Sequence, residues 1–160
     1  MGWFAAIALG VGGVLVVIIG TYVAGMRFKV GFAQGAVIAF TKHVVNPRVR
    51  RTAGTPGASA AIIRNVGRTS GRVYETPVGA EPVEGGYVIA LPYGSRPSWL
   101  RNVLAAGEAT LVHQGGTYRV DRPEVIPLEE VAAAFPASDQ KLHSLFRVDR
   151  ALRVHRAEPA

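Results

Sequence analysis

Residues 60–91, AAIIRNVGRTSGRVYETPVGAEPVEGGYVIAL, decide the fold class of this chain of 160 residues. Three apolar runs rich in Val, Ile and Tyr are separated here by turns that contain two glycines each. The runs are residues 60–66, 73–80 and 87–91, and the turns are Gly67–Arg72 and Glu84–Gly86. Such alternation is typical of antiparallel strands. A doubly wound parallel sheet is disfavoured because it needs a helix after nearly every strand.

A helix is predicted over residues 97–106. Proline is tolerated in a first helical turn, Ser95 or Ser98 could cap that turn, and Gly107 is a typical stop. The apolar side chains at helical spacing predict one face that packs on the core, with Arg101 and Asn102 pointing elsewhere. The residues expected on that face are Trp99, Leu100, Val103 and Leu104.

The C-terminal third of the chain continues this pattern of short elements. A hairpin is predicted around Gln114–Gly116, and two short helices and a last strand follow. The hairpin strands are residues 109–113 and 118–121, the helices residues 127–135 and 138–146, and the strand residues 152–155. Five or six sequential strands with a few short helices predict an α+β chain built on an antiparallel barrel.

The N-terminal segment has a different composition, because residues 1–26 contain no charged side chain. A helix over Trp3–Gly25 would span about 34 Å, which is enough to cross a bilayer core. Arg27, Lys29 and Lys42 follow it and favour a cytoplasmic domain behind a single-pass anchor in the cell membrane. A cleaved leader or a buried helix is the alternative. We therefore divide the chain into an anchor (1–26), a juxtamembrane helix and linker (27–57) and a barrel domain (58–160).

The net charge of +7 and the residue content exclude or disfavour several functions. Without cysteine there is no disulfide, thiolate ligand or Cys nucleophile. The four histidines form no i, i+4 pair, and no metal site is predicted. The scattered basic residues do not predict nucleic-acid binding, although Arg48, Arg50 and Arg51 could contact anionic membrane lipid or lie on a solvated linker.

Two loops remain that are suited to an anion. The turn Gly67–Arg72 can present backbone N–H groups and the guanidinium groups of Arg68 and Arg72. The loop Tyr93–Pro97 leads into a helix N-terminus, with Ser95 and Arg96 beside it. Each loop alone could be a solvated turn. Together, beside an apolar barrel, they predict a cofactor with a phosphate tail and an aromatic head.

These residues carry a resemblance to a known family. The turn Gly67-Arg68-Thr69-Ser70-Gly71, then Pro77 and Tyr93-Gly94, and finally residues 99–107 (WLRNVLAAG) resemble the deazaflavin-dependent nitroreductases. The resemblance covers about residues 58–126. It implies a split β-barrel related to the pyridoxamine-phosphate-oxidase-like flavin proteins, and a homodimer is compatible with it because related barrels often dimerise.

The resemblance also implies a cofactor and an activity. Members bind reduced coenzyme F420 and pass a hydride to a small-molecule acceptor, which is a quinone, a nitro compound or an unsaturated substrate. The turn would hold the phosphate or tail, the loop would border the deazaflavin, and the residues of the following helix would pack against that loop and brace it. The implied cofactor-binding residues are Arg68, Thr69, Ser70, Gly71, Arg72, Tyr93, Gly94, Ser95, Arg96, Trp99 and Asn102.

The chain departs from the family pattern on the acceptor side. The loop before the helix is short and has no lysine, Leu100 replaces a usual tyrosine, and residues 138–146 contain no tyrosine. Tyr93 and His143 are the candidate proton donors, and the acceptor stays open. FMN is the alternative cofactor, haem another, and a non-catalytic binder of deazaflavin, lipid or fatty acid is the alternative function. A membrane-dissolved quinone would suit an anchored domain.

Overall fold

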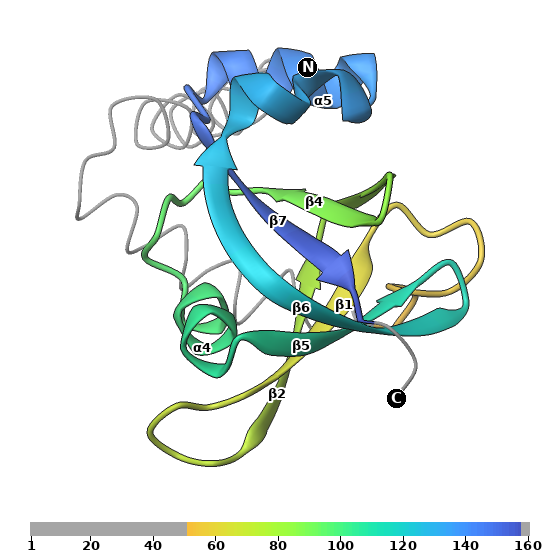
Figure 1. Ribbon diagram of the computed structural model, residues 1–160. Coiled ribbons are helices and arrows are strands. Elements are labelled where there is room, and N and C mark those ends of the chain that lie inside the picture. Colours follow the sequence, from red (N-terminus) through yellow and green to blue (C-terminus); the bar gives the residue numbers. More distant parts are fainter. Residues whose placement is uncertain (1–50, 158–160) are drawn as a thin grey trace, which may run out of the picture.

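The computed structural model describes residues 51–157 (Figure 1). A stretch of turns over residues 51–57 leads into seven strands, two α-helices and one 3-10 helix. The elements are β1 (Ala61–Val66), β2 (Val73–Val78), β3 (Ala80–Val83), β4 (Gly86–Ala90), α4 (Ser98–Ala106), β5 (Glu108–His113), β6 (Gly116–Pro127), η2 (Leu128–Ala134), α5 (Ala137–Leu145) and β7 (Arg150–Arg156).

All seven strands belong to one antiparallel sheet with the order β2-β1-β5-β6-β7-β4-β3. The long strand β6 pairs with β5 through its first half and with β7 through its second half. A register shift between Asp121 and Glu124 bends it, and the sheet curls into a half-barrel (Figure 1). The two edge strands of the sheet are β2 and β3.

The apolar core fills the curl of the sheet in two parts. Leu100 and Val103 of α4 are fully buried against Ile63, Leu111 and their neighbours, so that this helix closes one end of the half-barrel. The second cluster lies under η2, where Leu128 and Val131 pack with strand side chains. Burial of this many aliphatic side chains is the main force that holds the strands together.

The prediction of an antiparallel α+β domain with short helices is confirmed, and the curled seven-strand sheet fits the split barrel that the resemblance implies, with differences in detail. Gly79 divides the strand predicted over residues 73–80, and residues 80–83 form the separate edge strand β3. The helix α4 ends at Gly107, whose φ of 74° is left-handed, as predicted. The expected serine cap is wrong, because Pro97 is the N-cap and no side chain bonds the first turn.

The predicted membrane anchor and most of the predicted juxtamembrane segment, residues 27–50, lie outside the described residues. Within residues 51–157 no helix is both long and apolar enough to cross a bilayer.

Candidate functional site

The turn Gly67–Arg72 joins β1 to β2 and is closed by its own backbone. Gly67 donates an N–H bond of 2.7 Å to the carbonyl of Arg72, and Gly71, at a φ of 67°, donates one of 2.8 Å to the carbonyl of Gly67. Gly67 is buried, and a Cβ atom there would lie 2.6 Å from the Tyr74 ring. The N–H groups of Thr69 and Ser70 have no partner among the described residues, so they are available to a ligand.

A single buried amide ties this turn to α4. The Asn102 side-chain oxygen accepts bonds from the Arg68 backbone N–H, at 3.3 Å, and from the Arg68 guanidinium, at 3.0 Å. Its amide nitrogen donates a 2.9 Å bond to the Asn65 side-chain oxygen. Asn102 is only 6% exposed, whereas Leu104 is 40% exposed. The predictions that Asn102 points away from the core and that Leu104 faces it are therefore wrong.

Asn102 braces a different loop from the one the resemblance implies. Its bonds go to the turn after β1, and no described bond joins it to the loop Tyr93–Arg96. Its partner Asn65 is 3% exposed, and the Asn65 amide nitrogen has no partner among the described residues. Asn65 lies next to the last residue of β1, and it was not identified from the sequence as part of the site.

The loop Tyr93–Pro97 connects β4 to α4 and is turned by Gly94, which has a φ of 61° and bonds the Leu91 carbonyl at 2.9 Å. Ser95 and Arg96 are exposed at its outer side. Tyr93 and Pro97 face inward and line a cleft, and so does Trp99 at the start of the helix. Both predicted loops adjoin α4, which is bonded to the turn at Asn102 and begins after the loop, but no residue of Gly67–Arg72 lines the cleft.

The cleft has a volume of about 210 Å³ and lies between the ends of β2 and β4, α4 and α5. Apolar side chains dominate its walls, and three ionisable side chains approach it from β3 and α5. The lining residues are Pro77, Val78, Gly79, Glu81, Ile89, Ala90, Leu91, Pro92, Tyr93, Pro97, Trp99, Phe135, Asp139 and His143. Both candidate proton donors, Tyr93 and His143, are among them.

Two ionisable groups of the cleft, Glu81 and His143, have shifted pKa values. Burial raises the pKa of Glu81, and the neighbouring Asp139 carboxylate raises it further. Burial lowers the pKa of His143, which Asp139 partly offsets, and the imidazole lies edge-on to the Phe135 ring at 4.9 Å between centroids. His143 is therefore neutral at neutral pH. Glu81 and Asp139 were missed because they join the cleft only through long-range packing.

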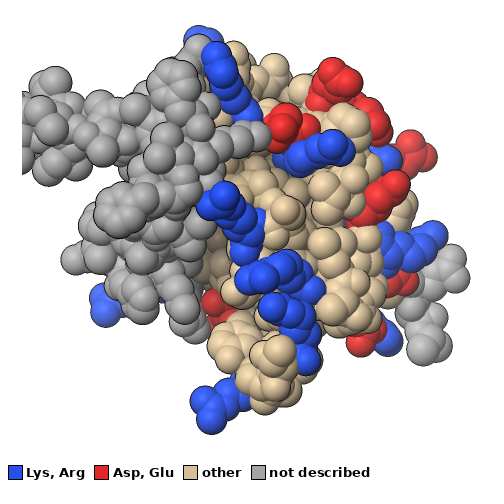
Figure 2. All heavy atoms as spheres, turned by 90° about the vertical axis from the view of Figure 1, so that its left-hand side faces the viewer, with Lys and Arg blue, Asp and Glu red and all other residues tan. Residues whose placement is uncertain are grey.

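Four arginines around α4 make this side of the molecule basic. Within residues 51–157, Arg68, Arg72, Arg96 and Arg101 are exposed and form no ion pair. Figure 2 shows basic side chains in a band down this face, with acidic ones gathered mainly to one side. An anion that approached this face would meet unneutralised charge.

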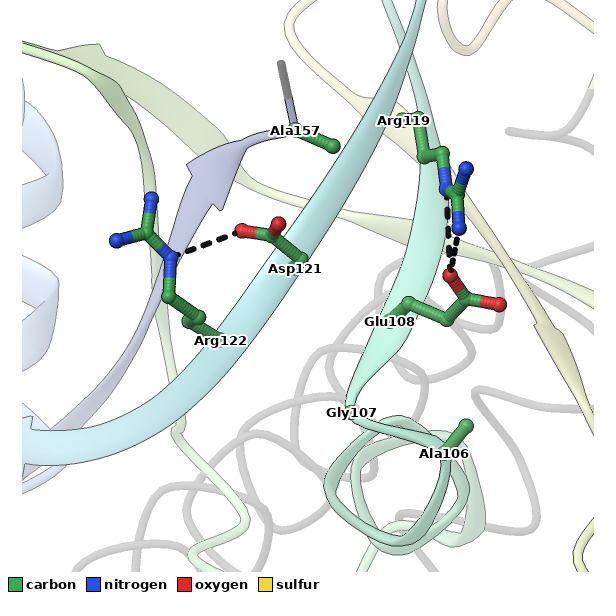
Figure 3. A pocket seen from close by; sticks show the side chains of 7 residues that line it. All are labelled: Ala106, Gly107, Glu108, Arg119, Asp121, Arg122 and Ala157. Atoms are coloured by element: carbon green, nitrogen blue, oxygen red, sulfur yellow. Dashed lines mark hydrogen bonds and ion pairs between the residues drawn. The ribbon is translucent and has the colours of Figure 1, made fainter. Parts of the chain in front are cut away.

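A larger hollow of about 530 Å³ lies at the other end of α4 (Figure 3). Its charges are already paired, since Arg119 bonds Glu108 at 2.6 Å and Arg122 bonds Asp121 at 3.2 Å. Figure 3 shows small and paired side chains around it, with no aromatic or large aliphatic wall. The smaller cleft is the better candidate for a cofactor ring, because it combines apolar walls with a few polar groups.

In the part of the chain that the structure describes, no group of three or more His, Asp or Glu side chains is placed to hold a metal ion.

Comparison with known proteins shows similarity of fold. No protein-family model and no curated protein matches the chain. The heme storage protein HutZ from Vibrio cholerae is 10% identical, with a TM-score of 0.50 over 71% of this chain and 88% of that protein. An F420-H2 dependent reductase, FDR-A, is 16% identical, with a TM-score of 0.43 over 61% of this chain and 94% of the reductase.

A protein of unknown function from Agrobacterium tumefaciens is 15% identical, with a TM-score of 0.48 over 70% of this chain. The match spans only 55% of that protein's length. At these identities the similarity concerns the fold alone.

Proposed function

We propose that this protein is an oxidoreductase that binds reduced coenzyme F420 and transfers a hydride to a quinone, nitro or unsaturated acceptor. The observation that carries the proposal is the link between Arg68 and Asn102, which fixes an anion-binding turn to the helix whose first residues line an apolar cleft. The resemblance in sequence supplies the identity of the cofactor.

The residues present suit a molecule with an acidic tail and an aromatic ring. Arg68 and the N–H groups of Thr69 and Ser70 would hold the phosphate or tail, and Arg72 and Arg96 add charge that no carboxylate within residues 51–157 pairs with. The apolar wall would receive part of the ring and exclude water. Because a volume of about 210 Å³ is below the usual range for ligand pockets, the ring would be only partly enclosed.

When bound, the reduced coenzyme supplies a hydride, so the chain needs no nucleophile of its own. The acceptor must also take up a proton. Tyr93 and His143 line the cleft as the candidate proton donors, and His143, which is neutral at neutral pH, would first have to take up a proton before it could deliver one to the acceptor oxygen. Glu81 lies on the same wall, where burial and the Asp139 carboxylate raise its pKa.

The location at the membrane belongs to the same proposal. A single-pass anchor over residues 1–26 would keep the domain at the cytoplasmic face, where a membrane-dissolved quinone has a high local concentration. We expect small-molecule acceptors and membrane lipid as partners, a homodimer as the assembly state to test, and no nucleic acid.

The binding is tested by titrating the full chain with reduced F420 and measuring the quenching of its tryptophan fluorescence. We expect the Arg68→Ala variant to bind about 10- to 100-fold more weakly, since a charged bond to phosphate contributes roughly 1.5–3 kcal/mol. The matched control Arg119→Ala, whose arginine is paired with Glu108 in the other hollow, should bind normally. Absence of micromolar binding by the parent chain, or equal affinity of both variants, would refute the site.

The second candidate function is a non-catalytic binder on the same half-barrel, and the small cleft favours it. Such a binder would retain deazaflavin, lipid or fatty acid but would not reoxidise bound coenzyme when a quinone or nitro compound is added. If the purified protein contains FMN or haem, that group and not the deazaflavin is its cofactor, and the half-barrel fold still holds.

A further inference from the structure

The end of the β1–β2 hairpin, residues 66–74, carries exposed apolar side chains. Val66 is 51% exposed, Val73 is 68% exposed and Tyr74 is 46% exposed. Val66 and Val73 are register partners, so they form one apolar pair on the face that points away from α4. Figure 1 shows this hairpin projecting past α4, away from the body of the sheet. We call residues 66–74 the hairpin tip.

The exposure at the hairpin tip is concentrated rather than scattered. Six large hydrophobic side chains are exposed in residues 51–157, and three of them lie in these nine positions. Single exposed apolar residues are common, but a group of them on a projecting hairpin indicates a contact surface. The tip also belongs to the edge strand β2, which has no neighbour on its outer side within the described residues.

The charge on the hairpin tip indicates which contact it makes. Arg68 and Arg72 are exposed there and form no ion pair within the described residues. The nearest carboxylate on the hairpin, Glu75, is engaged by Arg64 at 2.7 Å. The surface is therefore apolar and positively charged, with no acidic side chain left to oppose a negatively charged partner.

We propose that the hairpin tip rests on the surface of an anionic lipid bilayer. Val66 and Val73 would enter the boundary between headgroups and acyl chains, while the Arg72 guanidinium contacts lipid phosphates. Tyr74 is the register partner of Asn65 and lies on the opposite face of the hairpin, where its hydroxyl is 3.1 Å from the Ser70 hydroxyl. The valine pair is independent of the cofactor proposed above, whereas Arg72 is shared with that proposal.

A second copy of the chain fits the hairpin tip less well. A two-fold interface places the same patch against itself, so the unpaired arginines of one copy would face those of the other. The sequence also favours lipid, since residues 1–26 are uncharged and long enough to span a bilayer. The 24 residues between that run and the described domain could extend at most about 80 Å, so the hairpin tip stays within reach of the same membrane.

The lack of cysteine in this chain makes a site-specific probe straightforward. The full chain, one copy per lipid nanodisc, is labelled with an environment-sensitive fluorophore at Val73→Cys. The matched control is Glu84→Cys, an exposed position on the β3–β4 turn at the opposite edge of the sheet. Lipids with a nitroxide on the acyl chain measure depth, in discs with and without phosphatidylserine.

We expect the lipid nitroxide to quench the Val73 probe at least about twofold more than the Glu84 probe, and phosphatidylserine to increase this difference. Arg72→Gln in the Val73→Cys background should reduce the phosphatidylserine effect without changing thermal unfolding. Val66→Cys repeats the measurement on the paired strand. Equal quenching of the probes at positions 73 and 84 would overturn the proposal. So would a change in the fluorescence of the Val73 probe that appears only when two copies share a disc.

Discussion

Replacement of Asn102 by alanine tests the central claim that one buried amide holds the glycine turn on α4. The change removes the two bonds from Arg68 and leaves the Asn65 oxygen, at a position 3% exposed, without its donor. An unpaired buried acceptor costs about 1–3 kcal/mol, and the loss of the partly exposed Arg68 bonds adds roughly 1 kcal/mol. We expect a total loss of about 2–4 kcal/mol in the free energy of unfolding, or roughly 10–25 °C in Tm.

The measurement uses thermal and urea unfolding of the full chain in detergent, followed by the fluorescence of Trp99, with Trp3→Phe to silence the other tryptophan. Arg68→Ala should cost about 1 kcal/mol or less, because its effect is confined to the exposed end of the network. In the double variant Asn65→Val with Asn102→Ala the orphaned oxygen is gone, so the double change should cost less than the sum of the singles by at least about 1 kcal/mol. Additive losses, or a loss below about 0.5 kcal/mol for Asn102→Ala, would refute this account of the network.

Three further predictions concern other parts of the domain. Gly86→Ala should cost about 3 kcal/mol or more in urea unfolding because its Cβ would collide with the backbone of β7, whereas Gly79→Ala, with open space around it, should be near neutral. The pKa of Glu81 is raised in the fold because burial favours the protonated carboxyl group, so this group destabilises the fold as the pH rises above its pKa in the unfolded chain. Glu81→Gln should therefore raise Tm at pH 7 and should lose this advantage at about pH 4 and below. Arg156→Ala should lower stability by about 1–3 kcal/mol because the buried Tyr87 hydroxyl loses its 2.8 Å partner, and Tyr87→Phe in that background should recover part of it in a double-mutant cycle.

Local sequence signals predicted the elements that depend on local rules. Glycines and short polar loops are visible in the sequence, and they mark the turns at Gly67–Arg72 and Glu84–Gly86 and the end of the helix at Gly107. The strand β3 was missed because Pro82 argues against a strand; its position at an open edge explains why the missing N–H is tolerated.

The candidate site was only partly predictable. The two loops and their arginines were identified from residue type, but the cleft walls come from residues 77–143 through contacts between elements distant in sequence. Asn102 was placed on the polar side because helical periodicity assumes that an amide faces water. Its burial depends on a second amide, Asn65, presented by another strand, and periodicity carries no information about such a pair.

The three-residue chain Asn65–Asn102–Arg68 has an evolutionary consequence. Each end of the Asn102 amide serves a different partner, so a change at Asn65 or Asn102 strands a polar group of the other, whereas a change at Arg68 leaves its backbone N–H bond in place. Among homologues, positions 65 and 102 should therefore vary as a pair, and position 68 should vary more freely.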